Sequence, residues 1–424
     1  PMASETATPA TADVLTTVDG RPLKAALAEA QRTRRIRAVL LVTPLLLFIF
    51  ATFLFPIALM MFRSVDNPLI AQNLPKTIAV LEKSWNGKDV PGEEAFAALR
   101  EDLMASRAAG QVGKVATRLN FETSGMRSAV TRTARKAKKM KAPYKDQILK
   151  VHDAWSKREV WATIKRLAPT ITGANYLAAV DRKYDADDNI VSQPEERQIY
   201  VTLFMKTLWM STIVTVSCLL LGFPIAYLLA SLPLRHSNLL MILVLLPFWT
   251  SLLVRTTSWI VLLQTQGVLN DIMVWIGIID DENRIQLIFN AQGTVIAMTQ
   301  ILLPFMVLPL YSVMKTISPS YLRAAQSLGA HRFLAYYRIY LPNTMAGIGA
   351  GCLLVFILAI GYYITPALVG GQDGQMISNV IAFHMQKSLN WGLGAALGGI
   401  LLVGVCMLYW LYNKLVGVDN LKLG

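Results

Sequence analysis

Long apolar runs separated by short polar connections fill most of the second half of the chain, and one more lies near its start. The first run, about Ala38–Phe62, has about 25 residues, long enough to cross a bilayer and too long for a signal-peptide core. We therefore expect an uncleaved helix there, with Pro44 and Pro56 tolerated inside it. Five more runs follow, near Tyr200–Ala230, Leu239–Leu263, Gly293–Val313, Thr344–Leu368 and Leu393–Leu415. The pattern predicts an all-α, polytopic membrane protein with six transmembrane helices.

A polar and charged segment, about 63–198, separates the first apolar run from the other five. It contains helix-forming stretches such as Glu93–Asn120 and Asp146–Leu167, and a cationic cluster at Arg132–Lys141. A segment of this length is not governed by the positive-inside rule, so its charge alone does not decide its side of the membrane. We expect a helical insert that folds outside the bilayer.

Positive charge in the short connections indicates the topology. The N-terminal arm ends in a run of arginines directly before the first apolar run, which places the arm in the cytoplasm and the insert outside. The basic segment 316–342 and the tail with Lys414 and Lys422 then also fall inside, and the acidic turn at 280–282 falls outside. The predicted parts are a cytoplasmic arm (1–37), a first transmembrane helix (38–62), an extracytoplasmic insert (63–198) and a core with five helices (199–424), both termini being cytoplasmic.

Composition supports a membrane protein and argues against a soluble domain, a nucleic-acid-binding protein and a metal-binding protein. The chain has 424 residues, of which 54% are hydrophobic and 16% charged, whereas soluble domains carry about 25% charged residues. Its net charge of +14 fits basic loops that contact anionic lipid, and no nucleic-acid-binding motif accompanies it. The cysteines lie inside apolar runs, and neither they nor the four histidines have a metal-binding spacing.

The segment 316–342, between the fourth and fifth apolar runs, is basic and helix-forming. Ser318 is a suitable N-cap and Pro319 suits the first helical position, so we expect a short helix over 319–334. Gly329 can either end this helix or permit close approach of another protein. The proline of Leu341-Pro342 is expected to stop the local helix before the next span begins.

Three landmarks in this segment carry a resemblance to a known family. Ala324-Ala325 is followed after three residues by Gly329, and after nine more by Ile339-x-Leu341-Pro342. This is similar to the EAA loop of ABC-importer permeases, except that Arg323 stands where the family has Glu. The resemblance implies that a separate ATPase contacts this loop, and we hypothesise that the ATPase offers an acid to Arg323. The implied coupling residues are Arg323, Ala324, Ala325, Ser327, Gly329, Ala330, Ile339, Leu341 and Pro342.

The resemblance extends over about 200–415. Segments that resemble the spermidine/putrescine branch of the family are Leu221–Ala230, Leu245–Thr257, Gly267–Asn270, Ile364–Gly371, Asn390-Trp391 and Gly394–Ala396. It implies the fold of a type I ABC importer permease in a bacterial inner membrane. It also implies an ABC ATPase dimer that binds ATP-Mg, a second, homologous permease subunit forming a heterodimer, a periplasmic solute-binding protein and membrane lipid as partners. Nucleic acid is not an expected partner.

The sequence predicts no catalytic residues, no metal site and no cofactor of its own. It contains no Gly-x-x-x-x-Gly-Lys-Ser/Thr phosphate loop, so ATP is expected to bind to another chain. The solute favoured by the resemblance is a polyamine, although intramembrane acids that would attract a polycation are scarce. Aromatic rings can bind organic cations instead. Candidate path residues are Trp249, Thr250, Arg255, Trp259, Tyr362, Tyr363 and Thr365, with Gln264 and Gln300; Arg255 is also open to a structural role.

Other functions stay open. An ABC permease for an opine, a phosphonate or an amino acid would carry the same motifs. A membrane receptor with an extracytoplasmic sensing domain would need a cytoplasmic signalling domain, and an ion-coupled transporter would need intramembrane carboxylates. The basic insert is interpreted as a solvated helical surface, a docking surface for the solute-binding protein, a contact to anionic polymer or lipid, or a structural cap.

Overall fold

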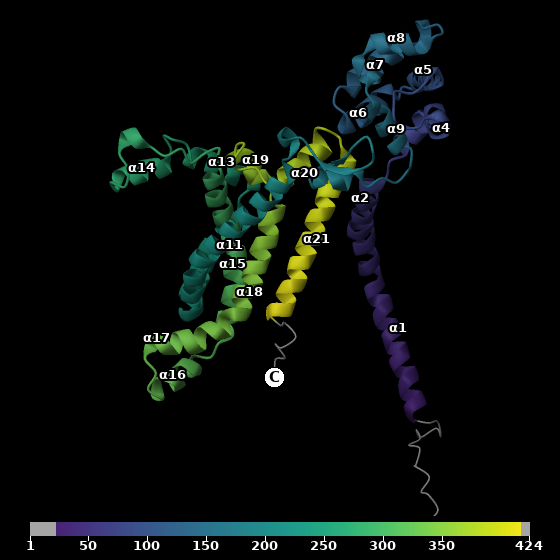
Figure 1. Ribbon diagram of the computed structural model, residues 1–424. Coiled ribbons are helices and arrows are strands. Elements are labelled where there is room, and N and C mark those ends of the chain that lie inside the picture. Colours follow the sequence, from purple (N-terminus) through teal and green to yellow (C-terminus); the bar gives the residue numbers. More distant parts are fainter. Residues whose placement is uncertain (1–22, 417–424) are drawn as a thin grey trace, which may run out of the picture. The chain divides into compact units, whose positions relative to one another are not determined.

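The computed structural model describes residues 23–416 (Figure 1). The chain separates into two compact units after Phe62, and each is described by itself. The first unit contains α1 (Leu23–Ile49), the π-helical turn η1 (Phe50–Leu54) and the beginning of α2 (Phe55–Val65). Its large apolar side chains between residues 36 and 59 are exposed. The cytoplasmic arm predicted at 1–37 lies outside the described residues up to residue 22, as does Lys422 of the predicted tail.

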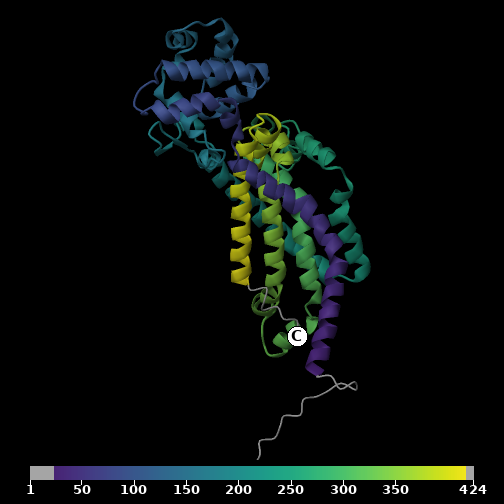
Figure 2. The ribbon, with the colours of Figure 1, turned by 90° about the vertical axis from the view of Figure 1, so that its right-hand side faces the viewer.

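Three long helices of the second unit form the centre of the membrane region. Helices α11 (Tyr200–Ser231), α15 (Ala291–Thr316) and α18 (Leu341–Gly361) lie side by side and share one hydrophobic core (Figures 1 and 2). Met306 of α15 is fully buried in this core. A Cβ atom at Gly351 would lie 2.7 Å from the Met306 sulfur, and one at Gly222 would lie 3.0 Å from its Cγ. Glycine at these two positions therefore lets α11 and α18 approach α15 closely.

The described residues confirm the predicted all-α, polytopic architecture. Five helices are long and apolar enough to cross a membrane, and one bent helix pair brings the number to six if it forms a single span. The five are Arg34–Val65, Tyr200–Ser231, Ala291–Thr316, Arg332–Gly361 and Trp391–Lys414. The other elements of this region are α12 (Leu234–Leu245), η5 (Leu246–Trp249), α13 (Leu252–Leu262), α14 (Val268–Trp275), η6 (Asp281–Asn283), α16 (Pro319–Ser327), α17 (Arg332–Ala335), η7 (Tyr336–Tyr340), α19 (Ile364–Val369), α20 (Ile377–Gln386) and α21 (Trp391–Val416).

The third and fifth spans differ from their predictions. The run expected as one helix at Leu239–Leu263 is broken, because α12 with η5 and α13 meet at an angle of 96°. The helix expected at Thr344–Leu368 ends at Gly361 instead, and a separate helix, α19, begins at Ile364. Side chains of α20 bind both carbonyls at this second break. Ser378 Oγ donates to the Tyr362 oxygen at 2.7 Å, and Asn379 Nδ2 donates to the Tyr363 oxygen at 2.8 Å, which also accepts from the Ala367 N–H.

Two prolines, Pro56 and Pro342, each follow a π-helical turn. Pro56 is the second residue of α2 and comes directly after η1, and Pro342 is the second residue of α18 and comes directly after η7. Proline has no N–H to donate to the carbonyl four residues before it, and a wider turn ahead of the ring accommodates this loss. The expectation that Pro342 stops the helix is therefore wrong, because the helix continues from Arg332 to Gly361.

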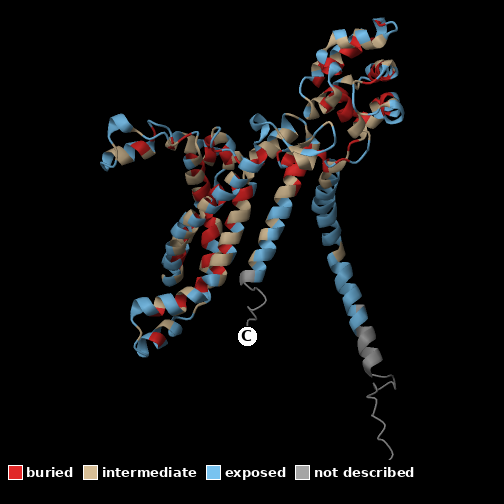
Figure 3. Ribbon diagram, in the orientation of Figure 1, coloured by how far each residue is buried: buried red, intermediate tan, exposed pale blue. Residues whose placement is uncertain are grey.

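The insert has a hydrophobic core of its own. Buried residues gather between its helices (Figure 3), with Trp155 and Trp161 at the centre and the Phe96 ring centroid 4.7 Å from that of Trp161. Both indole N–H groups have partners, because Trp155 donates to Thr133 Oγ1 at 3.0 Å and Trp161 to the Trp155 carbonyl at 2.9 Å. Its elements are α3 (Pro68–Asn73), α4 (Pro75–Ser84), α5 (Glu93–Ala108), α6 (Val112–Glu122), α7 (Met126–Lys136), η2 (Ala137–Lys139), α8 (Tyr144–Val151), η3 (Asp153–Ser156), α9 (Arg158–Arg166), α10 (Ala174–Ala179), β1 (Arg182–Tyr184), β2 (Ile190–Ser192) and η4 (Glu195–Arg197).

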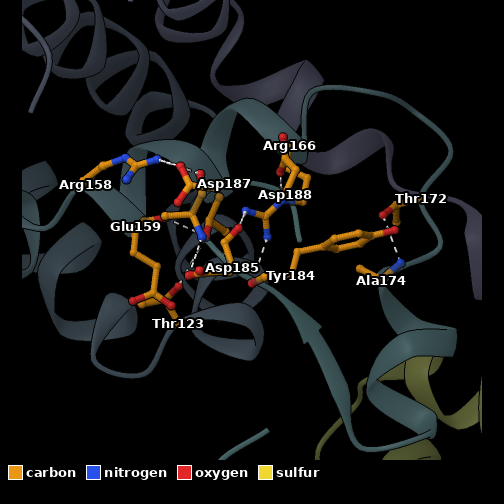
Figure 4. A network of polar contacts seen from close by, with 12 residues as sticks. Thr123, Arg158, Glu159, Arg166, Thr172, Ala174, Tyr184, Asp185, Asp187 and Asp188 are labelled. Carbon is orange, nitrogen blue, oxygen red and sulfur yellow. Dashed lines mark hydrogen bonds and ion pairs between the residues drawn. The ribbon is translucent and has the colours of Figure 1, made fainter. Parts of the chain in front are cut away.

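The only strands among the described residues, β1 and β2, form an antiparallel hairpin that is attached to α9. Arg158 pairs with Asp187, and Arg166 Nε donates to Asp188 Oδ1 at 2.8 Å (Figure 4). The Arg166 guanidinium also lies 5.1 Å from the centroid of the Tyr184 ring, which is on the hairpin. These contacts fix the hairpin, and with it the segment that leads into α11.

The two ends of the insert meet again near the membrane helices. The Asn67 N–H donates to the Thr170 carbonyl at 2.7 Å, and the Thr172 N–H donates to the Val65 carbonyl at 2.8 Å. Helix α10 follows directly and packs against α21, where a Cβ at Gly392 would lie 2.6 Å from Asn175 Nδ2. We call residues 63–69 and 170–181 the foot of the insert.

Inside the insert, a buried carboxylate on α5 caps a different helix. Both oxygens of Asp102 lie at the beginning of α4, where Oδ2 accepts from the N–H and the hydroxyl of Thr77, each at 2.7 Å. Replacing Asp102 with alanine leaves the buried Thr77 N–H without this acceptor, so we expect the insert to lose about 1–3 kcal/mol of stability. Glu101→Gln, at an exposed neighbour, is the control and should change little.

The loss at Asp102 should depend on pH. Burial raises the pKa of Asp102 above its ordinary value, partly offset by the Thr77 hydrogen bonds that lower it. A raised folded-state pKa means that the native insert holds this proton more tightly than the unfolded chain, so its contribution is greatest at acid pH and falls as the pH rises through the folded pKa. Hydrogen exchange of α5 peptides in wild type and Asp102→Ala, corrected for the intrinsic pH dependence of exchange, measures this contribution at each pH. An advantage of wild type over Asp102→Ala that grows with pH would contradict this assignment.

Candidate functional site

Helix α16 is built as a short, firmly terminated helix. It begins after Ser318, whose Oγ accepts from the Ser320 N–H at 3.3 Å, and Pro319 occupies its first position. It ends at Ser327, so the helix expected over 319–334 is shorter than predicted. A second helix, α17, then begins at Arg332.

Gly329 is the residue that ends α16. Its φ of +88° lies in the left-handed region, which glycine enters without a steric penalty. The Gly329 N–H donates to the Gln326 carbonyl and the Ala330 N–H to the Ala325 carbonyl, both at 3.0 Å. This pair of bonds is the Schellman motif. Of the two roles considered for Gly329, the structure shows helix termination, and a Cβ there would have no atom within 4 Å.

Aromatic rings attach the segment 316–342, which we call the coupling segment, to α11. The Tyr227 ring on α11 lies edge-on against Tyr336 and Tyr340 of η7, with ring centroids 5.6 and 5.4 Å apart. At the same end of the helices, Lys315 Nζ donates to the Ala230 carbonyl at 3.4 Å. Helix α16 therefore lies at the C-terminal end of α11, and the foot of the insert lies at its N-terminal end, about 48 Å away for 32 residues.

The predicted coupling residues fall into three groups by burial. Ala325 is buried against the rest of the segment, whereas Arg323, Ala324, Ser327, Gly329 and Pro342 are exposed; Ala330, Ile339 and Leu341 are half-buried. The sequence interpretation missed five exposed side chains beside them. These are Tyr321, Leu328, Phe333, Leu334 and Tyr337, with Leu328 89% and Phe333 73% exposed. Large apolar residues in a polar connection were the signal that could have found them.

The structure brings together only some of the predicted path residues. Trp259 on α13 donates its indole N–H to Gln300 Oε1 on α15 at 3.1 Å, and the Thr256 and Thr365 hydroxyls lie 3.4 Å apart. Thr365 is fully buried, Tyr362 is half-buried and Tyr363 is partly exposed. These residues lie where α13, α15 and α19 meet. Their contact with a solute stays a prediction.

Three other path candidates lie at the broken third span. Arg255 donates to the carbonyl of Pro247, and its Nη2 lies 3.1 Å from the Thr250 carbonyl oxygen. These bonds join α13, which carries Arg255, to η5 across the bend. Trp249, at the same bend, is 75% exposed. These contacts favour the structural role for Arg255, and its contact with a solute stays a prediction.

Two turns near these residues need glycine because a side chain would collide with a backbone oxygen. A Cβ at Gly267 would lie 2.6 Å from the Val261 carbonyl oxygen, and Asn270 Nδ2 holds this turn by donating to the Ile285 carbonyl at 2.9 Å. A Cβ at Gly371 would lie 2.5 Å from the Phe289 oxygen. In the described residues, no three His, Cys, Asp or Glu side chains come together in a way that could hold a metal ion.

Comparison with known proteins identifies the family. Residues 207–416 match the family model described as "Binding-protein-dependent transport system inner membrane component". The Escherichia coli K12 protein named "Spermidine/putrescine transport system permease protein PotB" is 39% identical over 221 residues, covering 51% of this chain and 80% of that protein. The Haemophilus influenzae protein of the same name is 38% identical over 222 residues, covering 51% and 77%.

A more distant relative is the Escherichia coli protein named "Inner membrane ABC transporter permease protein YdcU". It is 28% identical over 233 residues, which cover 52% of this chain and 73% of that protein. Among solved structures, a chain of a bacterial alginate ABC transporter is 19% identical, covers 55% of this chain and 82% of its own length, and has a TM-score of 0.43. The matched region begins at residue 207, so none of the family match falls on the insert. The chain belongs to the family of binding-protein-dependent transport system inner membrane components, and it is a multi-pass protein of the inner membrane.

Proposed function

We propose that the chain is the transmembrane pore subunit of an ATP-driven ABC importer that moves a polyamine, such as spermidine or putrescine, inward by alternating access. The observation that supports this most directly is the 39% identity across four fifths of a protein named as a spermidine/putrescine permease. The terminated helix α16 at the far end of the membrane bundle supports the ATP-driven mechanism, because it supplies a rigid element that a partner can push.

ATP hydrolysis would take place in a separate ATPase dimer that binds ATP-Mg, and this chain would have no catalytic activity. The exposed side chains of Tyr321, Leu328, Phe333 and Tyr337 support an ATPase contact, since a monomer rarely leaves so many large apolar residues in one polar segment. Closure of the ATPase dimer would displace α16. The tyrosine cluster at Tyr227 would then transmit this movement to α11.

The remaining partners and the orientation follow from the same proposal. A homologous second permease subunit would complete the pore, and a periplasmic solute-binding protein would deliver the solute. Both termini would be cytoplasmic and the insert extracytoplasmic, which is supported by the basic residues at the α16 end and the acidic ones at 280–282. A polyamine path would use the rings of Trp259, Tyr362 and Tyr363, because aromatic faces attract organic cations.

The direct test is uptake by a reconstituted complex. The chain would be purified with its ATPase, second permease and binding protein and placed in proteoliposomes loaded with ATP-Mg. We expect ATP-dependent uptake of labelled spermidine or putrescine, suppressed by excess unlabelled polyamine but not by an opine, a phosphonate or an amino acid. Uptake of one of those solutes instead, with none of polyamine, would overturn the proposed substrate while leaving the ABC mechanism in place.

Reversing the charge of Arg323 should weaken the ATPase contact. Arg323 is exposed on α16, and within residues 23–416 it forms no ion pair, so it is available to a partner acid. An exposed pair contributes about 0–1 kcal/mol, so Arg323→Glu is expected to lower substrate-stimulated ATPase activity by up to about fivefold. The matched control is Arg332→Glu, an equal reversal at an exposed arginine of α17 outside the motif. A rise in stimulated activity in Arg323→Glu would contradict the partner acid.

A further inference from the structure

A cavity of about 1080 Å³ lies between the insert and the turn that joins α20 to α21. One wall comes from the foot of the insert, beginning at Arg63, and a second comes from α6 and the loop before it. The third wall is the segment 387–392. None of the predicted site residues lies here, and the proposed transport function does not account for the cavity.

The cavity is strongly basic. Its charged lining residues are Arg63, Lys114, Arg118, Arg127 and Lys387, against one acid, Asp66. Glu122, which lies on α6 with Arg118, is paired with Arg118 Nη1 at 2.9 Å. Such a surface repels a polyamine, so the cavity is not part of the proposed solute path. Its charge instead suits an anion.

Arg118 leaves part of its guanidinium unused. Its Nε donates to Asn67 Oδ1 at 3.0 Å and its Nη1 donates to Glu122 Oε1 at 2.9 Å. The third nitrogen, Nη2, is buried and has no hydrogen-bond partner among the described residues. Buried polar groups in native proteins almost always have a partner, so this guanidinium has the capacity to donate to one more acceptor when it turns toward the cavity.

The first turn of α6 adds to the positive field. Gly110 and Gly113 line the cavity on either side of the helix start at Val112. The Gly110 N–H donates to the Arg107 carbonyl, and the N-cap residue, Gln111, makes no side-chain cap to the first turn of α6. Helix N-termini carry a partial positive charge and bind phosphate groups through free backbone N–H donors.

Two membrane spans place the cavity at the level of the lipid headgroups. Arg63 lies in the last turn of α2, at the end of the span candidate Arg34–Val65, and Trp391 is the first residue of the span candidate that ends at Lys414. The Arg63 guanidinium lies 5.7 Å from the centroid of the Trp391 ring. Tryptophan and arginine at the ends of spans are typical of the membrane–water interface.

We propose that this cavity binds the phosphate of an anionic phospholipid headgroup on the membrane face that carries the insert. The lipid would join the insert to the start of α21, with its phosphate near Arg118 and the first turn of α6. Free inorganic phosphate offers the same chemistry, but the position at the ends of two spans favours a lipid. An acidic loop of a partner protein is less suited as the occupant, because the cavity walls come from the insert and from the turn that joins α20 to α21.

The test compares two variants with equal loss of charge. The cavity variant, Lys114→Gln with Arg127→Gln and Lys387→Gln, changes exposed side chains and leaves the Arg118 contacts intact. The control variant, Lys136→Gln with Lys138→Gln and Lys139→Gln, changes three exposed lysines of the insert that do not line the cavity. Full-length chains in complex with their partners would be assembled in nanodiscs with equal phosphatidylglycerol and phosphatidylcholine, and the lipid retained after mild detergent would be counted by mass spectrometry.

We expect wild type and the control variant to retain phosphatidylglycerol in preference to phosphatidylcholine. The cavity variant should retain at least about tenfold less phosphatidylglycerol, since each lysine or arginine near an anionic lipid raises the affinity on the order of fivefold. Short-chain phosphatidylglycerol should also raise the melting temperature of the wild-type complex more than short-chain phosphatidylcholine, a measurement that needs no variant.

Three results would overturn the proposal. The first is equal phosphatidylglycerol retention in the cavity and control variants. The second is stabilisation of wild type by inorganic phosphate with no enrichment of phosphatidylglycerol, which would identify a free anion as the occupant. The third is a cavity variant that keeps the lipid but loses affinity for the solute-binding protein, which would assign the cavity to an acidic partner. Because lipid retention requires no uptake, failure of the transport proposal would leave these readouts intact.

Discussion

Replacing Gly329 with valine is expected to separate ATP hydrolysis from solute uptake. The φ of +88° at this position costs an L-residue about 1–2 kcal/mol, and more for a β-branched one. No atom lies within 4 Å of the Cβ position, so the cost falls on the backbone and not on a neighbouring side chain. The helix end should then shift, and with it the exposed residue Leu328, which directly follows α16. We expect uptake to fall at least tenfold while basal ATPase activity and assembly are retained.

The matched control at this position is Gly329→Asn. Asparagine enters the left-handed region more readily than other non-glycine residues, so this variant should keep most of the uptake even though its side chain is larger than that of alanine. Gly329→Ala should fall between asparagine and valine. The three variants would be compared in proteoliposomes by uptake per ATP hydrolysed. If the valine variant imports as well as wild type, or if uptake follows side-chain volume and ignores the backbone preference, the helix end is not the coupling element.

Much of the membrane region could be predicted from the sequence because hydrophobic length is a strong signal. The first, second, fourth and sixth spans were found close to their predicted places, since each is an apolar run with polar ends. The cap at Ser318 and the glycine at 329 were also readable, because capping depends on residues that are adjacent in the chain. The coupling segment was therefore the most predictable part of the candidate site.

Features that depend on distant contacts could not be read in this way. The helix continues past Pro342 because a π-helical turn precedes it, and hydropathy carries no trace of that turn. The break after Gly361 is held by Ser378 and Asn379, which lie on another helix. The role of Arg255 likewise depends on a bend that forms only in three dimensions. In the last two cases the missing information was the location of a hydrogen-bond partner.

Substituting Asp181 should destabilise the beginning of α11 more than any other change in the foot of the insert. This carboxylate is buried, and its Oδ1 accepts from the N–H groups of Ile199 and Tyr200, each at 3.1 Å. Its Oδ2 accepts from the Val201 N–H at 2.8 Å. One residue of the insert thus satisfies three of the donors that a helix N-terminus leaves free, and its negative charge opposes the positive end of the helix.

Asp181→Ala removes all three acceptors, and we expect it to lower the stability of the chain by about 2–4 kcal/mol. Asp181→Asn keeps one side-chain carbonyl and should lose about half as much. Because Asp181 has a φ of +58°, part of the alanine effect comes from the backbone. Asp181→Gly relieves that strain without restoring an acceptor, so a glycine variant as stable as wild type would show that conformation, and not capping, is the function of this residue.

The matched control for Asp181 is Asp188→Asn. Asp188 has a similar φ of +61°, but its carboxylate is exposed and pairs only with Arg166 at the hairpin, so the change should cost less than about 1 kcal/mol. Thermal unfolding in detergent gives the overall effect, and hydrogen exchange locates it. The decisive result is faster exchange at the N–H groups of residues 199–201 in Asp181→Ala but not in Asp188→Asn. Uniformly faster exchange across the insert would instead mean that Asp181 stabilises the insert itself. The start of α11 would then not depend on capping by Asp181.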